Sequence, residues 1–105
     1  MPDSTESDRA IAQRMTICNQ RGLHARASAR FVRTAECFDA EISVTREGVT
    51  VGGTSIMGLM MLAAGPGSSI LVTAKGRQAR EALDAISGLI DCGFDEDEES
   101  AGGQA

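Results

Sequence analysis

Hydrophobic and polar residues alternate in four short stretches of the chain. In the stretch from Met15 to Cys18, Met15 and Ile17 share one face, which predicts a half-buried β-strand. The alternation returns in residues 42–45 and 49–51, on either side of Glu47-Gly48, a dipeptide typical of a two-residue β-hairpin turn. Residues 70–74 repeat the pattern and predict a last strand.

Other segments have apolar residues at helical spacing. Thr54-Ser55 precedes the Met-rich run 56–62, which predicts a short helix with Ser55 near its N-cap. The two longer predicted helices carry their apolar or small positions at Ala25, Ala29, Phe31, Val32 and Ala35, and at Ala79, Ala82, Leu83, Ile86, Leu89 and Ile90.

The predicted order is strand, helix, strand, strand, helix, strand, helix. Each strand has one apolar face only, so we expect an antiparallel or mixed sheet with helices on one side and water on the other. The fold class is α+β, a two-layer open-faced sandwich. A chain of 105 residues is enough for one such domain, which we place at residues 12–92. We expect residues 1–11 to be a disordered polar tail and residues 93–105 to be a disordered acidic tail, which we interpret as a solvating extension.

Charge and composition exclude several classes of function. The net charge is −5, but residues 9–94 hold ten basic and seven acidic side chains, so we expect only a local basic patch and no general binding of nucleic acid. No apolar window is long enough for a signal peptide or a membrane span, which predicts a soluble cytoplasmic protein. Cys18, Cys37 and Cys92 have no metal-ligand spacing and are interpreted as reduced thiols, with Cys37 or Cys92 partly buried.

His24 is the single histidine and lies between the loop NQRG and the predicted helix that starts near Ala25. A neutral imidazole has a free lone pair that can attack phosphorus. A phosphoryl group on it would lie over a helix N-terminus, where backbone N–H groups favour negative charge, and Arg26 is nearby. The alternative is that His24 only caps the helix or is a solvated surface side chain. Arg26, Arg30 and Arg33, here called the basic flank, share one side of the helix.

Two strings favour the chemical interpretation. Residues 22–26 read GLHAR and residues 55–62 read SIMGLMML. Together, and in this element order, they resemble the HPr family, the histidine phosphocarriers of bacterial phosphotransferase systems, over residues 12–92. The resemblance implies a four-stranded antiparallel sheet with three helices on one face. It also implies phosphorylation of His24 on the ring nitrogen nearer the backbone, a phosphate-steadying role for Arg26, and regulatory phosphorylation at Ser55, for which simple helix capping is the alternative.

The resemblance further implies a carrier without cofactor or metal, rather than an enzyme. Its expected partners are Enzyme I as phosphate donor, an EIIA-type acceptor and, for Ser55, an HPr kinase/phosphorylase, all bound by a monomer. The family's docking positions correspond to Ala25, Ala29, Ile56, Met57 and Met60, with the basic flank, including Arg30, facing acidic partner surfaces. A short helix cannot bury Ile56, Met57, Met60 and Met61 together, so part of this apolar surface should be exposed near His24.

One residue departs from the family pattern, because Ala27 stands where proline is usual. Ala27 keeps a backbone N–H that could reach the phosphate, so we expect a working site with an altered transfer rate. The sequence leaves open whether the chain serves sugar import or a regulatory, nitrogen-type branch. A binding module controlled only through Ser55 is a rival of another class. A hydrolase or metal enzyme is disfavoured because no second acid-base residue or ligand cluster accompanies His24.

Overall fold

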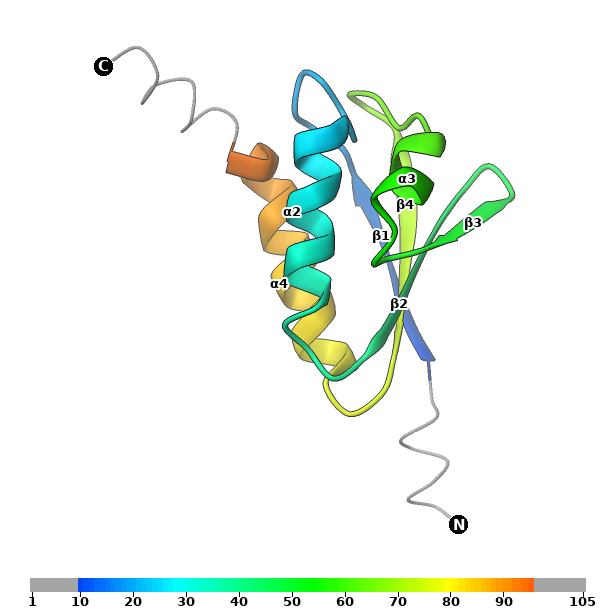
Figure 1. Ribbon diagram of the computed structural model, residues 1–105, viewed down its shortest axis with the longest axis vertical. Helices are drawn as coiled ribbons and strands as arrows, with labels where there is room; N and C mark the ends of the chain where they lie inside the picture. Colours follow the sequence, from blue (N-terminus) through cyan, green and yellow to red (C-terminus); the bar gives the residue numbers. More distant parts are fainter. Residues whose placement is uncertain (1–9, 96–105) are drawn as a thin grey trace.

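The structure is a computed structural model and describes residues 10–95. The described elements follow the predicted order (Figure 1). They are β1 (Ala10–Thr16), α2 (Ala25–Ala35), β2 (Glu41–Arg46), β3 (Val49–Gly52), α3 (Ile56–Met61), β4 (Ser69–Lys75), α4 (Ala79–Asp91) and the short 3₁₀ segment η1 (Gly93–Asp95).

The four strands form one sheet in the order β1-β4-β2-β3, and every neighbouring pair is antiparallel. Central strand β4 pairs Ile70 with Met15 of β1 and Val72 with Val44 of β2, and all four side chains are buried. Figure 1 shows the helices on one side of this sheet, while the other side is open. The predicted open-faced antiparallel sheet with three helices is confirmed.

A tight turn joins β2 to β3. Glu47 and Gly48 both have positive φ, 50° and 84°. Two successive positive φ values are those of a type I′ turn, whose twist matches that of paired strands. The predicted hairpin is therefore present, and it orients β3 so that the chain can enter α3.

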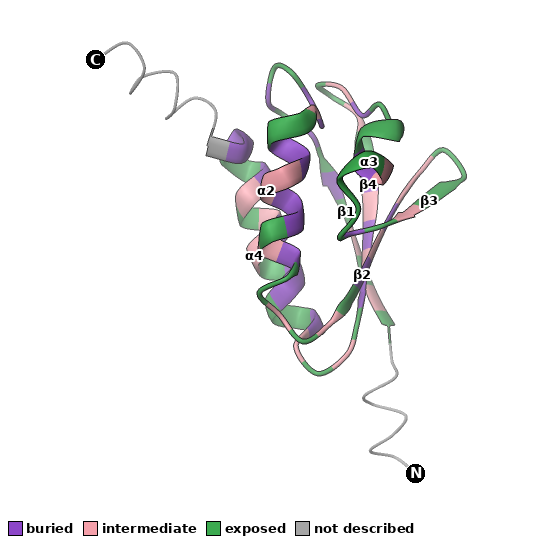
Figure 2. Ribbon diagram, viewed as in Figure 1, coloured by how far each residue is buried: buried purple, intermediate pink, exposed green. Residues whose placement is uncertain are grey.

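The hydrophobic core lies between the sheet and the inward faces of α2 and α4 (Figure 2). Phe31 of α2 is fully buried, which stabilises the fold by about 1.5–3 kcal/mol relative to an exposed side chain. The buried face of α2 is rotated from the one expected, because Ala25 is exposed and Ala29 is half-buried. The residues that α2 buries are Ala27, Ser28, Phe31, Val32 and Ala35.

The first strand starts earlier than the sequence pattern predicts. It runs from Ala10 to Thr16, so it includes two residues of the predicted N-terminal tail and leaves out Ile17 and Cys18, which were predicted to belong to it. The alternation is weak before Met15 because Gln13 occupies an inward position, where its Nε2 donates to Ser87 Oγ at 3.4 Å. The remainder of that tail, residues 1–9, lies outside the described residues.

The sequence places the start of the acidic tail at residue 93, which is too early, because the folded domain continues beyond it. Gly93 and Phe94 both have left-handed backbone conformations, with φ 66° and 57°, and Phe94 is fully buried. Burying one phenyl ring offsets the strain of its positive φ, since burial contributes about 1.5–3 kcal/mol. Residues 93–95 thus belong to the folded domain, and residues 96–105 lie outside the described part of the chain.

Candidate functional site

The loop before His24 is held against the loop that follows α3. Leu23 N–H donates to the Ala64 carbonyl at 2.9 Å, and buried Asn19 donates through Nδ2 to the Gly22 carbonyl at 2.8 Å. Gly22 has φ +66°, and a Cβ built on it would lie 2.3 Å from the Ala64 oxygen. Glycine is therefore required at position 22, and the close approach of the two loops fixes where α2 begins.

His24 is the N-cap residue of α2. Its backbone is extended, its carbonyl accepts from Ser28 N–H at 2.8 Å, and its Nδ1 accepts from Arg26 N–H at 3.2 Å. An accepting Nδ1 requires the neutral tautomer with its hydrogen on Nε2. The ring is half-exposed. The structure thus places a lone pair of an accessible imidazole over the first turn of a helix, where backbone N–H groups attract anions.

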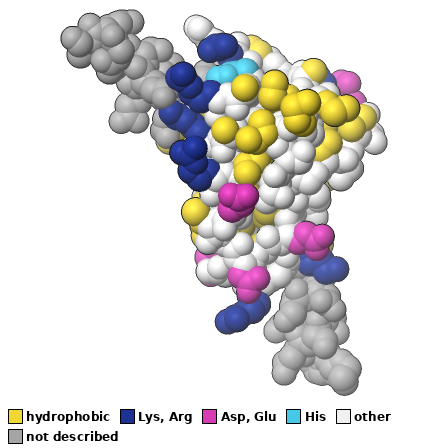
Figure 3. All heavy atoms as spheres, in the orientation of Figure 1, with side chains coloured by type: hydrophobic (Ala, Val, Ile, Leu, Met, Phe, Trp, Pro, Cys, Tyr) yellow, Lys and Arg dark blue, Asp and Glu magenta, His cyan; other side chains and the backbone are white. Residues whose placement is uncertain are grey.

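The basic flank extends along α2 from this point. Arg26 and Arg33 are exposed, whereas Arg30 is half-buried and its Nη1 donates to the Phe94 carbonyl at 2.6 Å. Figure 3 shows a row of Lys and Arg side chains beside the histidine. The contact of Arg30 with η1 was not anticipated from the sequence, because Phe94 is an isolated apolar residue next to an acidic run.

Helix α3 has the same kind of N-terminus as α2. Exposed Ser55 is the N-cap, and its Oγ accepts from Gly58 N–H at 3.0 Å, as the sequence predicts. The helix buries Leu59 and leaves a large apolar surface exposed, as expected, which Figure 3 shows next to the histidine. The exposed fractions are 39% for Ile56, 70% for Met57, 38% for Met60 and 75% for Met61.

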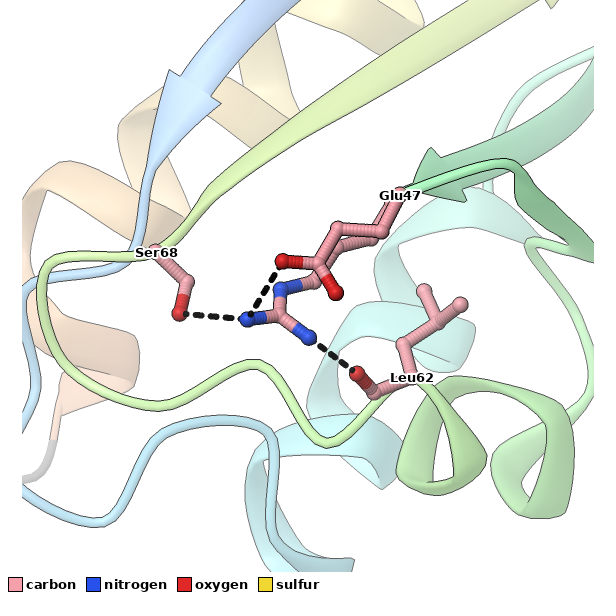
Figure 4. Close-up of polar contacts among 4 residues, drawn as sticks. Glu47, Leu62 and Ser68 are labelled. Atoms are coloured by element: carbon pink, nitrogen blue, oxygen red, sulfur yellow. Dashed lines mark hydrogen bonds and ion pairs between the residues drawn. The ribbon is translucent and has the colours of Figure 1, made fainter.

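Arg46 of β2 holds the other end of α3, a role that the sequence did not indicate. Its Nη1 donates to the carbonyl of Leu62, the C-cap residue, at 3.0 Å, and its Nη2 donates to Ser68 Oγ at 3.4 Å (Figure 4). Glu47 lies 3.6 Å from the same Nη2. A positive charge at a helix C-terminus is stabilising, so Arg46 fixes α3 and the loop after it relative to the sheet.

The family whose sequence model matches this chain is described as the PTS HPr component phosphorylation site, and the match covers residues 11–91. The chain belongs to the HPr family. It is 46% identical to the phosphocarrier protein HPr of Neisseria meningitidis over 88 residues, which cover 84% of this chain and 99% of that protein. It is 43% identical to the phosphocarrier protein NPr of Shewanella violacea over 86 residues, which cover 82% of this chain and 94% of that protein.

Solved HPr structures agree with the fold. HPr from Bacillus anthracis matches with a TM-score of 0.75 and 40% identity, over 79% of this chain and 99% of that one. HPr-C-His from Thermoanaerobacter tengcongensis matches with a TM-score of 0.77 and 37% identity, over 80% of this chain and 94% of that one. HPr-family proteins are phosphocarriers, so a carrier role rather than catalysis is supported for this chain.

Other features of this HPr-family chain bear on the remaining expectations. The three cysteines are free thiols, and all are exposed, so partial burial of Cys37 or Cys92 is wrong. Within residues 10–95 there is no group of three His, Cys, Asp or Glu side chains that could hold a metal ion. In the same range, no helix has the length and apolar character needed to cross a membrane.

One HPr of Thermoanaerobacter tengcongensis, 39% identical, is described as a dimer, whereas the sequence predicts a monomer.

Proposed function

We propose that this chain accepts a phosphoryl group on Nδ1 of His24 from phosphorylated Enzyme I and passes it to an EIIA-type protein. The observation that supports this proposal most directly is the position of Nδ1, which faces the first turn of α2 at 3.2 Å from Arg26 N. Membership of the HPr family supports the carrier role in general.

The transfer step uses the lone pair that Nδ1 directs at Arg26 N–H. As the bond between Nδ1 and phosphorus forms, the bond between phosphorus and the donor atom breaks, and its electron pair returns to the donor. Arg26 N–H then loses its acceptor on the ring and becomes available to a phosphoryl oxygen. The hydrogen stays on Nε2, so His24 needs no separate base to remove a proton.

Two further groups stabilise the negative charge that arrives. Arg26 supplies a guanidinium on an exposed side chain two residues after His24, and charge-assisted hydrogen bonds to phosphate are stronger than neutral ones. Ala27 supplies a backbone N–H in the first turn of α2, where such groups have no intrahelical acceptor. With proline at this position the second donor would be absent.

The partner-binding surface combines α3 with the start of α2. Its apolar members are Ile56, Met57 and Met60, and Ala25 and Ala29 continue it on α2, with Arg30 at its basic edge. Methionine side chains adapt to surfaces of different shape, which suits a carrier that meets a donor and then an acceptor at the same place. Such contacts would be transient, because the same surface has to be vacated between the two encounters.

Ser55 is proposed as a regulatory site for a kinase of the HPr kinase/phosphorylase type. A phosphate on its exposed Oγ would keep acceptor oxygens near Gly58 N–H, so the helix start tolerates it. The added charge of about −2 would lie beside the apolar docking surface and oppose the approach of acidic partners. Phosphorylation at Ser55 would therefore weaken docking without unfolding the domain.

The test is incubation of the chain with Enzyme I and labelled phosphoenolpyruvate, followed by mapping of the label. The expected product carries one acid-labile phosphate on His24, and phosphorus NMR assigns it to Nδ1. The His24→Ala variant is expected to fold, to stay unlabelled and to transfer nothing to an EIIA-type acceptor. Label on another residue, or transfer by His24→Ala, would contradict the proposal.

A regulatory, nitrogen-type role is the second candidate, and the 43% identity to an NPr favours it. The discriminating measurement compares kcat/KM for phosphorylation by a sugar-type Enzyme I and by its nitrogen-type counterpart. A preference of about 100-fold, or ~2.7 kcal/mol, for one donor would assign the branch.

A further inference from the structure

The folded domain ends directly beside the basic flank. Phe94 is fully buried, and its carbonyl accepts from Arg30 Nη1 at 2.6 Å. Arg30 is the middle residue of the basic flank. The bond therefore holds η1, the last described element of the chain, beside the middle of this flank. Figure 1 shows η1 next to α2, towards the end of the helix that carries His24.

The residues that follow are strongly acidic. Glu96, Asp97, Glu98 and Glu99, here called the acidic segment, come immediately after η1 in the sequence. The acidic segment carries four negative charges, and the basic flank carries three positive charges. Two of the three arginines of the flank are exposed, and one is half-buried. The charge of the segment thus complements the surface beside which it begins.

The acidic segment is also long enough to extend along the basic flank from Arg30 to Arg26. Four extended residues span up to about 13 Å. Arg30 and Arg26 are one helical turn apart, a rise of about 6 Å. A segment that starts at Arg30 can therefore lie along the flank as far as Arg26 without distorting η1.

We propose that the acidic segment binds the basic flank of its own chain and occupies the place where an acidic partner surface would dock. The competition with a partner rests on the proposed function, whereas the binding of the acidic segment to the basic flank does not. The segment then acts as an internal competitor that partners must displace. The affinity of the acidic segment for the basic flank falls as ionic strength rises, since exposed charges further apart than about 8–10 Å are screened at physiological salt.

The expected strength is modest. Each exposed ion pair contributes about 0.2–1 kcal/mol, so a few of them leave the segment bound for only part of the time. A short connection gives a local concentration in the millimolar range, which is sufficient for partial occupancy by a weak ligand. A partner that also covers the apolar surface of α3 displaces the segment easily. The competition therefore tunes affinity rather than blocking transfer.

The first test needs no phosphorylation. Amide NMR spectra are compared for the unaltered chain, the variant Glu96→Gln/Asp97→Asn/Glu98→Gln/Glu99→Gln, and a control, Asp3→Asn/Glu6→Gln/Asp8→Asn. At about 20 mM salt the first variant is expected to shift the amides of residues 25–33, and at about 500 mM the difference should vanish. The control should leave these amides unchanged. Equal effects of both variants, or no shift in either, would overturn the proposal.

A second arm identifies the occupant. A peptide of residues 95–100, added to the neutralised variant, should move the same amides back towards their positions in the unaltered chain. Shifts in the unaltered chain that depend on protein concentration would assign the flank to the tail of a second copy and overturn the intramolecular contact.

The third arm is kinetic. At low salt, the neutralised variant should have a KM for phosphorylated Enzyme I about two- to tenfold lower, with kcat unchanged. An unchanged KM together with the expected amide shifts would overturn the competition but not the contact. Failure of His24 to accept phosphate would overturn the proposed function and leave the amide result standing.

Discussion

Helices α2 and α3 begin in the same way but at residues of different chemistry. His24 Nδ1 accepts from a first-turn N–H at 3.2 Å in α2, and Ser55 Oγ accepts from one at 3.0 Å in α3. Each N-terminus offers backbone donors to an incoming phosphate. The imidazole presents a lone pair without losing a proton, whereas the hydroxyl has to be deprotonated before it attacks.

Because of this difference, the phosphorylation proposed at His24 and the phosphorylation proposed at Ser55 would serve separate purposes. A phosphoryl group on nitrogen can be passed on, while a phosphate on the serine hydroxyl needs an enzyme for its attachment and its removal. The two helices also differ in support. Helix α2 has eleven residues with a buried face, and α3 has six and buries only Leu59. The proposed transfer site thus lies on the helix with the larger buried face, and the proposed docking surface lies on the helix with the smaller one.

The largest expected effect is on the loop that fixes the start of α2. Gly22→Ala forces a Cβ against the Ala64 oxygen at a position with φ +66°, so it should lower the free energy of unfolding by about 3 kcal/mol. Chemical denaturation measures the change. The control is Gly65→Ala in the opposing loop, where a Cβ meets nothing within 4 Å. Equal stability of the two variants would refute the view that this loop contact is tight.

Arg46 supports α3 as the loop contact at Gly22 supports α2. Arg46→Met removes the hydrogen bonds to the Leu62 carbonyl and to Ser68, and it should cost about 1–2 kcal/mol of unfolding free energy. Glu47→Gln removes only the 3.6 Å ion pair and should cost less than about 0.5 kcal/mol. Thermal unfolding of both variants provides the measurement, and a larger loss in Glu47→Gln would disprove this assignment.

Ser55→Asp tests the regulatory half of the comparison. Aspartate caps a helix as well as serine does, so the stability should stay within about 0.5 kcal/mol of the unaltered chain. The new charge should raise the KM for phosphorylated Enzyme I about tenfold while kcat is retained. Ala12→Asp, which places the same charge on an exposed residue of β1, is the control and should have no such effect. An equal KM in both variants would count against a docking role for α3.

The smallest expected effect concerns Ala27. Ala27→Pro removes a first-turn N–H from α2 and should slow phosphoryl transfer about threefold, or ~0.6 kcal/mol. Rapid-quench kinetics with phosphorylated donor would measure the rate, and calorimetry the stability. A variant unchanged in both quantities would show that the N–H of residue 27 takes no part.

Short-range patterns made much of this structure predictable. The alternation in β2, β3 and β4 and the helical spacing in α4 are properties of neighbouring residues, and so is the capping of α3 by Ser55. The position of His24 before a helix could be predicted for the same reason. Small residues at 25, 27, 29 and 35 left the orientation of α2 ambiguous. Phe31, Val32 and Ala35 were therefore placed correctly on its buried face, whereas Ala25 and Ala29 were not.

Features that depend on distant contacts could not be predicted. Gln13 of β1 is inward because it meets Ser87 of α4, far along the chain. Phe94 is buried through the packing of η1, although the residues that follow it are acidic. The contacts of Arg46 span 16 and 22 residues, and nothing in the hairpin sequence indicates them.

The antiparallel path of β1 has a practical consequence for experiments on this chain. Ala10 pairs with Lys75 at one end of the sheet, and Thr16 leads into the loop before His24 at the other end. The C-terminal exit at η1 lies beside α2, whereas Ala10 is at the opposite end of the domain (Figure 1). A fluorophore or surface tether for binding measurements therefore belongs before Ala10. Attached after Asp95, the same group would be joined close to Phe94, whose carbonyl contacts Arg30 of the basic flank that is proposed to face partners.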